Sequence, residues 1–169
     1  MVNCLQILII YDSKTGNTEN MARAVAEGAR ELEGVDVRVK KADDATNEDL
    51  LKAEGIVVGS PTYYGQMSSK IKTMFDESVK IHGKLEGKVG AAFTSSGGVA
   101  SGAETTIISL LEAMLVHGMI IQGRARSGHY GAAAVGKPKE QDIDRCRELG
   151  RMVATLVPKL KTQKADARA

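Results

Sequence analysis

Aromatic residues are scarce in this sequence, which has no tryptophan, two phenylalanines and four tyrosines among its 169 residues. Two of the tyrosines, Tyr63 and Tyr64, stand side by side. An adjacent pair in so aromatic-poor a chain is suited to stacking against a planar ring. The alternative is that one tyrosine belongs to the core and the other to the surface.

Cysteine is also scarce, since Cys4 and Cys146 are the two present and lie near opposite ends of the chain. They form no CxxC pair and no metal-ligand spacing, so we predict two free thiols and no metal site. Free thiols are typical of the reducing cytoplasm. The apolar run Leu5–Tyr11 is of strand length, and it lacks the basic start and cleavage site of a signal peptide. We therefore expect a cytoplasmic protein without a membrane segment.

Neither sign of charge is in excess, because 23 Lys and Arg face 21 Asp and Glu, for a formal net charge of +2. The basic residues are scattered along the chain, which argues against a nucleic acid or an acidic membrane as partner. The 43% hydrophobic and 26% charged residues are typical of a globular protein. We predict one domain over residues 1–161 and a polar, frayed tail over residues 162–169.

Apolar runs of strand length alternate with segments of helical periodicity, and the alternation predicts an α/β fold. The predicted strands are Leu5–Tyr11, Val35–Lys40, Gly55–Ser60, Val89–Thr94 and Met119–Gln122, with a further extended piece at Ala132–Val135. The predicted helices are Asn17–Leu32, Asn47–Ala53, Ser69–Val79, Glu104–Val116 and Glu140–Val157. Pro158 should end or kink the last helix. Such a chain forms a parallel sheet with helices on both faces, and ligands bind at the carboxyl ends of its strands.

The loop after the first strand reads Ser13-Lys14-Thr15-Gly16-Asn17-Thr18 and leads directly into a helix. Hydroxyl groups, one amide and free backbone N–H groups at a helix N-terminus form an anion site, and Gly16 permits the tight turn. The chain has neither GxxxxGK[ST] nor GxGxxG, so nucleoside triphosphates and Rossmann dinucleotides lose their usual support. We predict that Ser13, Thr15, Gly16, Asn17 and Thr18 bind a phosphate monoester. The alternative is that the hydroxyls only cap the helix.

Several motifs together resemble the flavodoxin superfamily. The S/T-x-T-G-x-T pattern at residues 13–18 is similar to its FMN phosphate loop, and the similarity runs from about Leu5 to Val157. The segments Met21–Ala29, Gly59–Met67 and His117-Gly118-Met119 resemble the NAD(P)H:quinone oxidoreductases once called tryptophan-repressor-binding proteins. The resemblance implies a five-stranded sheet of order 2-1-3-4-5, FMN as cofactor, and a homo-oligomer as one assembly.

The resemblance also implies which loops contact the flavin ring. The segment Pro61-Thr62-Tyr63-Tyr64-Gly65 would pack along the ring, and Ser95-Ser96-Gly97-Gly98 would offer backbone N–H groups to its pyrimidine edge. His117 would lie beside the flavin as the catalytic residue, and Tyr130 would contact the cofactor from the loop after the fifth strand. For His117, the alternative is a structural histidine at a helix end.

The sequence alone leaves two functions open. Neither Pro61–Met67 nor Ser95–Gly102 contains Asp or Glu, whereas flavodoxins that carry single electrons are typically acidic around the flavin. A carboxylate about 6 Å from the ring would cost the reduced flavin roughly 3 kcal/mol. We therefore favour two-electron NAD(P)H:quinone reduction, with NAD(P)H and quinone as partners. The alternative is a single-electron carrier between redox proteins. A receiver-type signalling domain would need an aspartate where Ser60 stands.

Overall fold

The computed structural model describes residues 4–166, with side chains described up to Lys161. Its strands are β1 (Leu5–Tyr11), β2 (Val35–Lys41), β3 (Gly55–Pro61), β4 (Val89–Ser96), β5 (Ile120–Ile121) and β6 (Ala132–Val135). The strands are parallel, in the order β2-β1-β3-β4-β5, and β6 pairs with β4. The predicted α/β fold and strand order are confirmed.

The fifth position of the sheet is divided between two short strands. β5 pairs with Val89 and Gly90 at the start of β4, and β6 pairs with the end of β4 from Phe93 to Ser96. The predicted strand Met119–Gln122 is therefore only two residues long. The chain leaves the sheet because residues 122–131 form a loop closed on itself, in which the Arg124 N–H donates to the carbonyl oxygen of His129.

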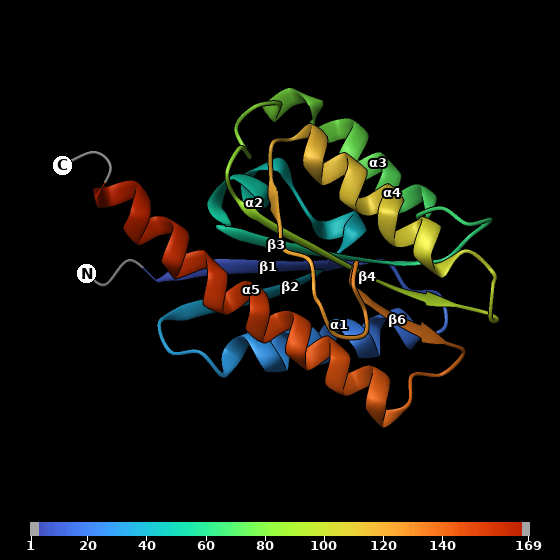
Figure 1. Ribbon diagram of the computed structural model, residues 1–169. Helices are drawn as coiled ribbons and strands as arrows, with labels where there is room; N and C mark the ends of the chain where they lie inside the picture. The colour runs from blue at the N-terminus through green and yellow to red at the C-terminus, as the bar shows by residue number, and fades with distance from the viewer. Residues whose placement is uncertain (1–3, 167–169) are drawn as a thin grey trace.

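Helices cover both faces of the sheet, and Figure 1 shows the two layers. One layer contains α1 (Asn17–Arg30) and α5 (Glu140–Asp166), and the other contains α2 (Asn47–Lys52), α3 (Ser69–Glu77) and α4 (Ala103–Val116). Two short 3-10 turns, η1 (Ala42–Asp44) and η2 (Ser78–Ile81), flank α2 and α3. Alternate residues of β1 enter the two cores, with Ile7 and Ile9 on the α1/α5 side. Leu8 and Ile10 enter the other core, as the two-residue period of a strand dictates.

The last helix is longer than the sequence predicts, because α5 continues through Pro158 to Asp166. A proline inside a helix costs about 3 kcal/mol. Contacts beyond it hold the helix to the domain, since Leu160 lies against the core and Lys161 Nζ lies 2.5 Å from Glu54 Oε1. Residues 162–166 are helical where we expected fraying, and residues 167–169 lie outside the described part of the chain.

α1 and α5 approach each other closely at two glycines. A Cβ atom at Gly28 would lie 1.9 Å from the carbonyl oxygen of Arg147, and one at Gly150 would lie 2.0 Å from that of Val25. Any side chain at either position would push the helices apart. The contact fixes α1, whose N-terminus carries the predicted phosphate loop. Within residues 4–166, no helix is both long and apolar enough to cross a membrane.

Candidate functional site

The loop between β1 and α1 is built as an anion site. Gly16 takes a left-handed conformation with φ 89°, and its N–H donates to Ser13 Oγ over 3.1 Å. No side-chain hydrogen bond caps α1, which is described over its full length, so these hydroxyls are not engaged in capping the helix. The N–H groups of the first turn have no partner within the helix. Together with the positive end of the helix dipole they favour a bound anion.

A buried hydroxyl pair joins the phosphate loop to the end of β4. Thr18 is 1% exposed, and its Oγ1 shares a 2.8 Å hydrogen bond with Ser95 Oγ. The Thr62 N–H donates to the carbonyl oxygen of Ser95 over 2.8 Å, and the Thr62 hydroxyl bonds that of Thr94 over 2.9 Å. The loops after β1, β3 and β4 are thereby held together at the carboxyl edge of the sheet.

The two tyrosines stand on a tight turn beside this junction. Tyr63 and Gln66 exchange both backbone hydrogen bonds at 3.0 Å. Between them Tyr64 has φ 50° and Gly65 has φ 72°, the positive values that a type I′ turn requires at both central residues. Tyr63 lines the pocket at 43% exposure, whereas Tyr64 projects fully into solvent. A left-handed tyrosine is uncommon and is expected where function holds it in place.

A cavity of about 270 Å³ opens where these loops meet. It is lined by Ser13, Lys14, Thr15, Asn17, Thr18, Pro61, Thr62, Tyr63, Ser95, Ser96, Gly97 and Gly136. Of the other predicted cofactor residues, Gly16, Tyr64, Gly65 and Gly98 are neighbours of these in the same three loops. The open space around Gly16, Gly97 and Gly98, where a Cβ would meet nothing within 4 Å, leaves room for a ligand.

Two lining residues, Lys14 and Gly136, were not predicted. Lys14 lies inside the phosphate motif, which drew attention to its hydroxyls. Gly136 follows β6, and its N–H donates to the carbonyl oxygen of Ser96 over 2.8 Å. The sequence predicts the extended piece Ala132–Val135 but not its pairing with the end of β4, and this pairing places Gly136 at the carboxyl edge.

His117 lies at the opposite edge of the sheet from this cavity, so the described chain does not bring it together with the other predicted site residues. It is the residue after α4, and the chain enters the sheet three residues later, where Ile120 pairs with the first residue of β4. Its ring is 6% exposed, and Nε2 lies 2.7 Å from Ser78 Oγ. Burial, with a smaller effect from His82, lowers the pKa of His117. The order helix, histidine, parallel strand already implied the amino edge.

Tyr130 is not brought to the cavity either. The next residue, Gly131, stands against Ala92, since a Cβ at Gly131 would lie 2.2 Å from the Ala92 carbonyl oxygen. Ala92 precedes the cavity residue Ser96 by four positions on β4, which is about 13 Å along a strand. Tyr130 is 56% exposed on the loop before β6, and Gly136 at the far end of β6 contacts the cavity instead.

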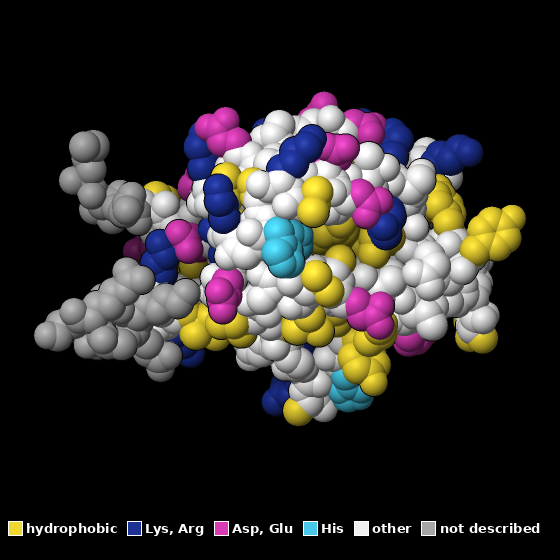
Figure 2. Space-filling model, turned by 90° about the horizontal axis from the view of Figure 1, so that it is seen from above, with side chains coloured by type: hydrophobic (Ala, Val, Ile, Leu, Met, Phe, Trp, Pro, Cys, Tyr) yellow, Lys and Arg dark blue, Asp and Glu magenta, His cyan; other side chains and the backbone are white. Residues whose placement is uncertain are grey.

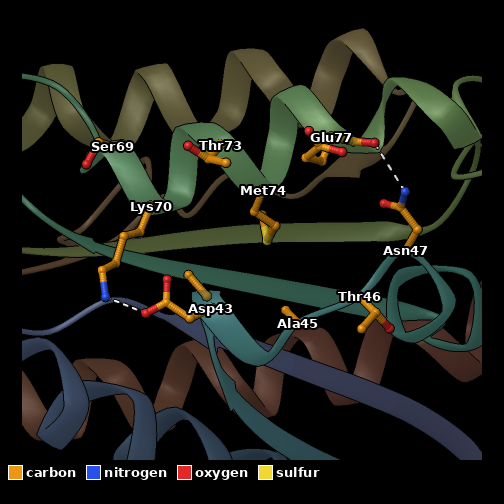
Figure 3. Close-up of a pocket in the computed structure, with 10 residues that line it drawn as sticks. Asp43, Ala45, Thr46, Asn47, Ser69, Lys70, Thr73, Met74 and Glu77 are labelled. Atoms are coloured by element: carbon orange, nitrogen blue, oxygen red, sulfur yellow. Dashed lines mark hydrogen bonds and ion pairs between the residues drawn. The ribbon is translucent and has the colours of Figure 1, made fainter.

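A larger hollow of about 470 Å³ lies between η1, the start of α2 and α3 (Figure 3). Some of its polar side chains are already partnered. Lys70 forms an ion pair with Asp43, and the Asn47 side-chain amide donates to the carbonyl oxygen of Glu77 over 3.1 Å. Met74, two alanines and the hydroxyl side chains of Thr46, Ser69 and Thr73 also line it. Its lining shares no residue with the loops after β1, β3 and β4 that form the smaller cavity, so size alone does not identify the site.

The donor set of the smaller cavity fits FMN. Thr15 offers a hydroxyl without a partner among the described residues, the first turn of α1 offers N–H groups, and Lys14 offers a positive charge to a phosphate. Gly97 and Tyr63 leave a flat, open space for a planar ring. A three-layer α/β sheet with an anion loop after its first strand and a ring-sized cavity at its carboxyl edge defines a mononucleotide-binding protein.

Comparison with known proteins agrees with this class. The flavodoxin family model matches residues 9–114. A flavodoxin of Aquifex aeolicus is 44% identical over 90% of this chain and 86% of its own. An NAD(P)H dehydrogenase (quinone) of Archaeoglobus fulgidus is 38% identical over 92% of this chain and 98% of its own. The crystal structure of a WrbA-like flavodoxin from Agrobacterium tumefaciens superposes with TM-score 0.78 at 27% identity, covering 92% and 98%. The chain belongs to the flavodoxin family, and its cofactor is FMN.

Proposed function

We propose that this protein is a two-electron oxidoreductase that uses FMN to pass reducing equivalents from NAD(P)H to a quinone. The observation that carries the proposal is the charge of the flavin cavity. Of its twelve lining residues only Lys14 is charged, and Lys14 is a cation. Bound FMN supplies a ring that accepts a hydride and is negatively charged when fully reduced. Neutral loops and a nearby lysine do not oppose that charge, whereas a carboxylate about 6 Å away would cost roughly 3 kcal/mol.

The residues of this chain supply binding and access. The phosphate loop and α1 hold the anionic end of the cofactor, and Gly97 leaves the cavity mouth open. Tyr63, half exposed on the lining, offers a phenol that can donate a hydrogen bond to an oxygen of the electron acceptor. Tyr63 thus takes the place at the acceptor that the sequence had suggested for His117. A cytoplasmic location suits free thiols and NAD(P)H chemistry, and a homo-oligomer stays a prediction.

A second candidate is a one-electron carrier between redox proteins. The flavodoxin of Aquifex aeolicus, at 44% identity, favours it. So does the rim of the cavity, where Tyr64 is fully exposed and Val99 is 87% exposed. Apolar side chains exposed beside a binding site are typical of surfaces that meet another protein.

Anaerobic reduction tests the proposal. FMN-loaded protein should lose its flavin absorbance with NADH or NADPH and regain it when a soluble quinone is added. Steady-state kinetics should be ping-pong, because the two substrates use the same flavin in turn. If neither nucleotide bleaches the flavin, while a reduced redox protein does, the carrier function is correct instead.

A matched pair of substitutions tests the electrostatic reason. Gly97→Asp adds a carboxylate at the open mouth of the cavity, and Gly97→Asn adds a side chain of the same shape without charge. The flavin reduction potential should be lower in the Asp variant than in the Asn variant, by up to about 120 mV for one electron. The difference should shrink at high salt. Equal potentials would show that loop charge does not tune this flavin.

A further inference from the structure

His117 carries a buried nitrogen without a partner. Ser78 Oγ donates its single proton to the carbonyl oxygen of Phe75 over 2.6 Å, so it can only accept from His117 Nε2, 2.7 Å away. His117 therefore carries a proton on Nε2, and in its neutral form its Nδ1 presents a lone pair. Nδ1 is buried and has no hydrogen-bond partner among the described residues. An unpaired buried acceptor costs about 1–3 kcal/mol, which calls for a ligand.

A second imidazole lies beside it. The rings of His82 and His117 have centroids 5.8 Å apart and an angle of 44° between their planes. His82 follows η2 and is exposed, so its ring can rotate. A zinc ion lies 2.0–2.1 Å from each imidazole nitrogen, or about 3.2 Å from each ring centre, so two rings at a tetrahedral angle stand about 5 Å apart. The 5.8 Å between the two ring centres is therefore close to the spacing of two imidazoles that share one ion.

From this arrangement we infer that His82 and His117 bind one divalent transition-metal ion of the Zn²⁺ class, through His117 Nδ1 and a ring nitrogen of His82. Ser78 is a positioning residue, because an imidazole that ligates a metal donates its other N–H to a neighbouring acceptor. Within residues 4–166, no group of three or more His, Cys, Asp or Glu side chains is arranged to hold a metal. Water must therefore complete the coordination, and imidazole ligands favour Zn²⁺, Ni²⁺ and Cu²⁺ over Mg²⁺ and Ca²⁺.

The position in the fold favours a cation. His117 directly follows the 14-residue helix α4, and the C-terminal end of a helix dipole attracts positive charge.

The bound ion would join the end of α4 to the segment that follows α3. Figure 2 looks down on the face that carries these helices, where hydrophobic side chains gather beside an exposed histidine. The exposed apolar residues of this region are Val79, Leu115 and Val116. The ion would lie at the amino edge of the sheet, away from the flavin cavity at the carboxyl edge, so metal binding can be measured independently of FMN chemistry.

Calorimetric titration of tag-free, FMN-loaded protein with Zn²⁺ tests the site. We expect one ion per chain, a higher melting temperature with Zn²⁺, and no change with Mg²⁺. His82→Ala should weaken Zn²⁺ binding at least tenfold. His129→Ala is the matched control, since His129 is exposed and its Nδ1 lies 2.8 Å from the carbonyl oxygen of Arg124; it should bind like the parent. Ser78→Ala should weaken binding tenfold or more.

Ring-nitrogen NMR gives a readout that does not depend on variants. Zn²⁺ should shift one nitrogen of His82 and the Nδ1 of His117, and leave His129 unchanged. The inference is overturned if His82→Ala binds Zn²⁺ as tightly as the parent, if the parent binds none, or if the shifted resonances belong to His129. Because His82 is exposed, its substitution tests the site even if variants of buried His117 fail to fold.

Discussion

Thr15 and Thr18 carry the same hydroxyl group but should respond differently to substitution. Thr15 lines the cavity, is exposed, and has no protein partner for its hydroxyl among the described residues. Thr15→Ala therefore removes only a contact with the FMN phosphate. A hydrogen bond to a charged group is worth about 1.5–3 kcal/mol, so FMN affinity should fall roughly 10- to 150-fold. Riboflavin lacks the phosphate and should bind the variant and the parent equally.

Thr18→Val should weaken both ligands. The Thr18 hydroxyl is buried and bonds Ser95 Oγ, so its loss also disturbs the loop expected to contact the flavin ring. Titration of the flavin-free parent and both variants with FMN and with riboflavin, followed by quenching of flavin fluorescence, measures all six affinities. A double-mutant cycle with Ser95→Ala should give a coupling energy of about 0.5–3 kcal/mol. The reasoning is refuted if riboflavin binding to Thr15→Ala falls as far as FMN binding, since Thr15 would then support the loop and not the phosphate.

Three further predictions concern the scaffold. Gly102→Ala should lower the free energy of unfolding by more than about 2 kcal/mol in denaturant titrations. The reason is that φ at Gly102 is 96° and the new Cβ would lie 2.5 Å from a backbone atom of the turn that holds the tyrosines. Gly34→Ala is the control, since φ is 82° but the space around it is open, and it should lose only about 1 kcal/mol. Burial raises the pKa of Cys146 to about 12, so mass spectrometry should find it unmodified by iodoacetamide at pH 8 until the protein unfolds, and modification of the native fold would contradict its burial. Burial by itself raises the pKa of Asp49. The hydrogen bonds from Lys40 and from Thr46, the capping residue of α2, lower the pKa by more, so that the net pKa lies below the ordinary value of an aspartate. The stabilising effect of the Asp49 carboxylate should be complete above about pH 4 and be lost as the pH falls further. The melting temperature of Asp49→Asn should therefore fall less steeply below about pH 4 than that of the parent. Equal slopes for the two proteins would exclude this role of Asp49.

The sequence by itself determined the class of fold and the anion loop. Both depend on neighbouring residues: apolar runs and helical periods mark the elements, and the hydroxyl-rich loop follows the first strand within a few positions. Parallel strands bring their carboxyl ends to one edge whatever the side-chain detail. The meeting of the loops after β1, β3 and β4 could therefore be predicted without coordinates.

Only the tertiary structure decided which side chains face the cavity. Thr18 and Ser95 are 77 positions apart and meet because α1 packs on the sheet that contains β4. Gly136 enters the lining because β6 rejoins the sheet beside the end of β4. The resemblance to quinone reductases suggested that His117 lies beside the flavin, yet α4 runs antiparallel to the strands and brings it to the amino edge. Local sequence specifies an element, but the direction in which that element packs decides which edge of the sheet its ends reach.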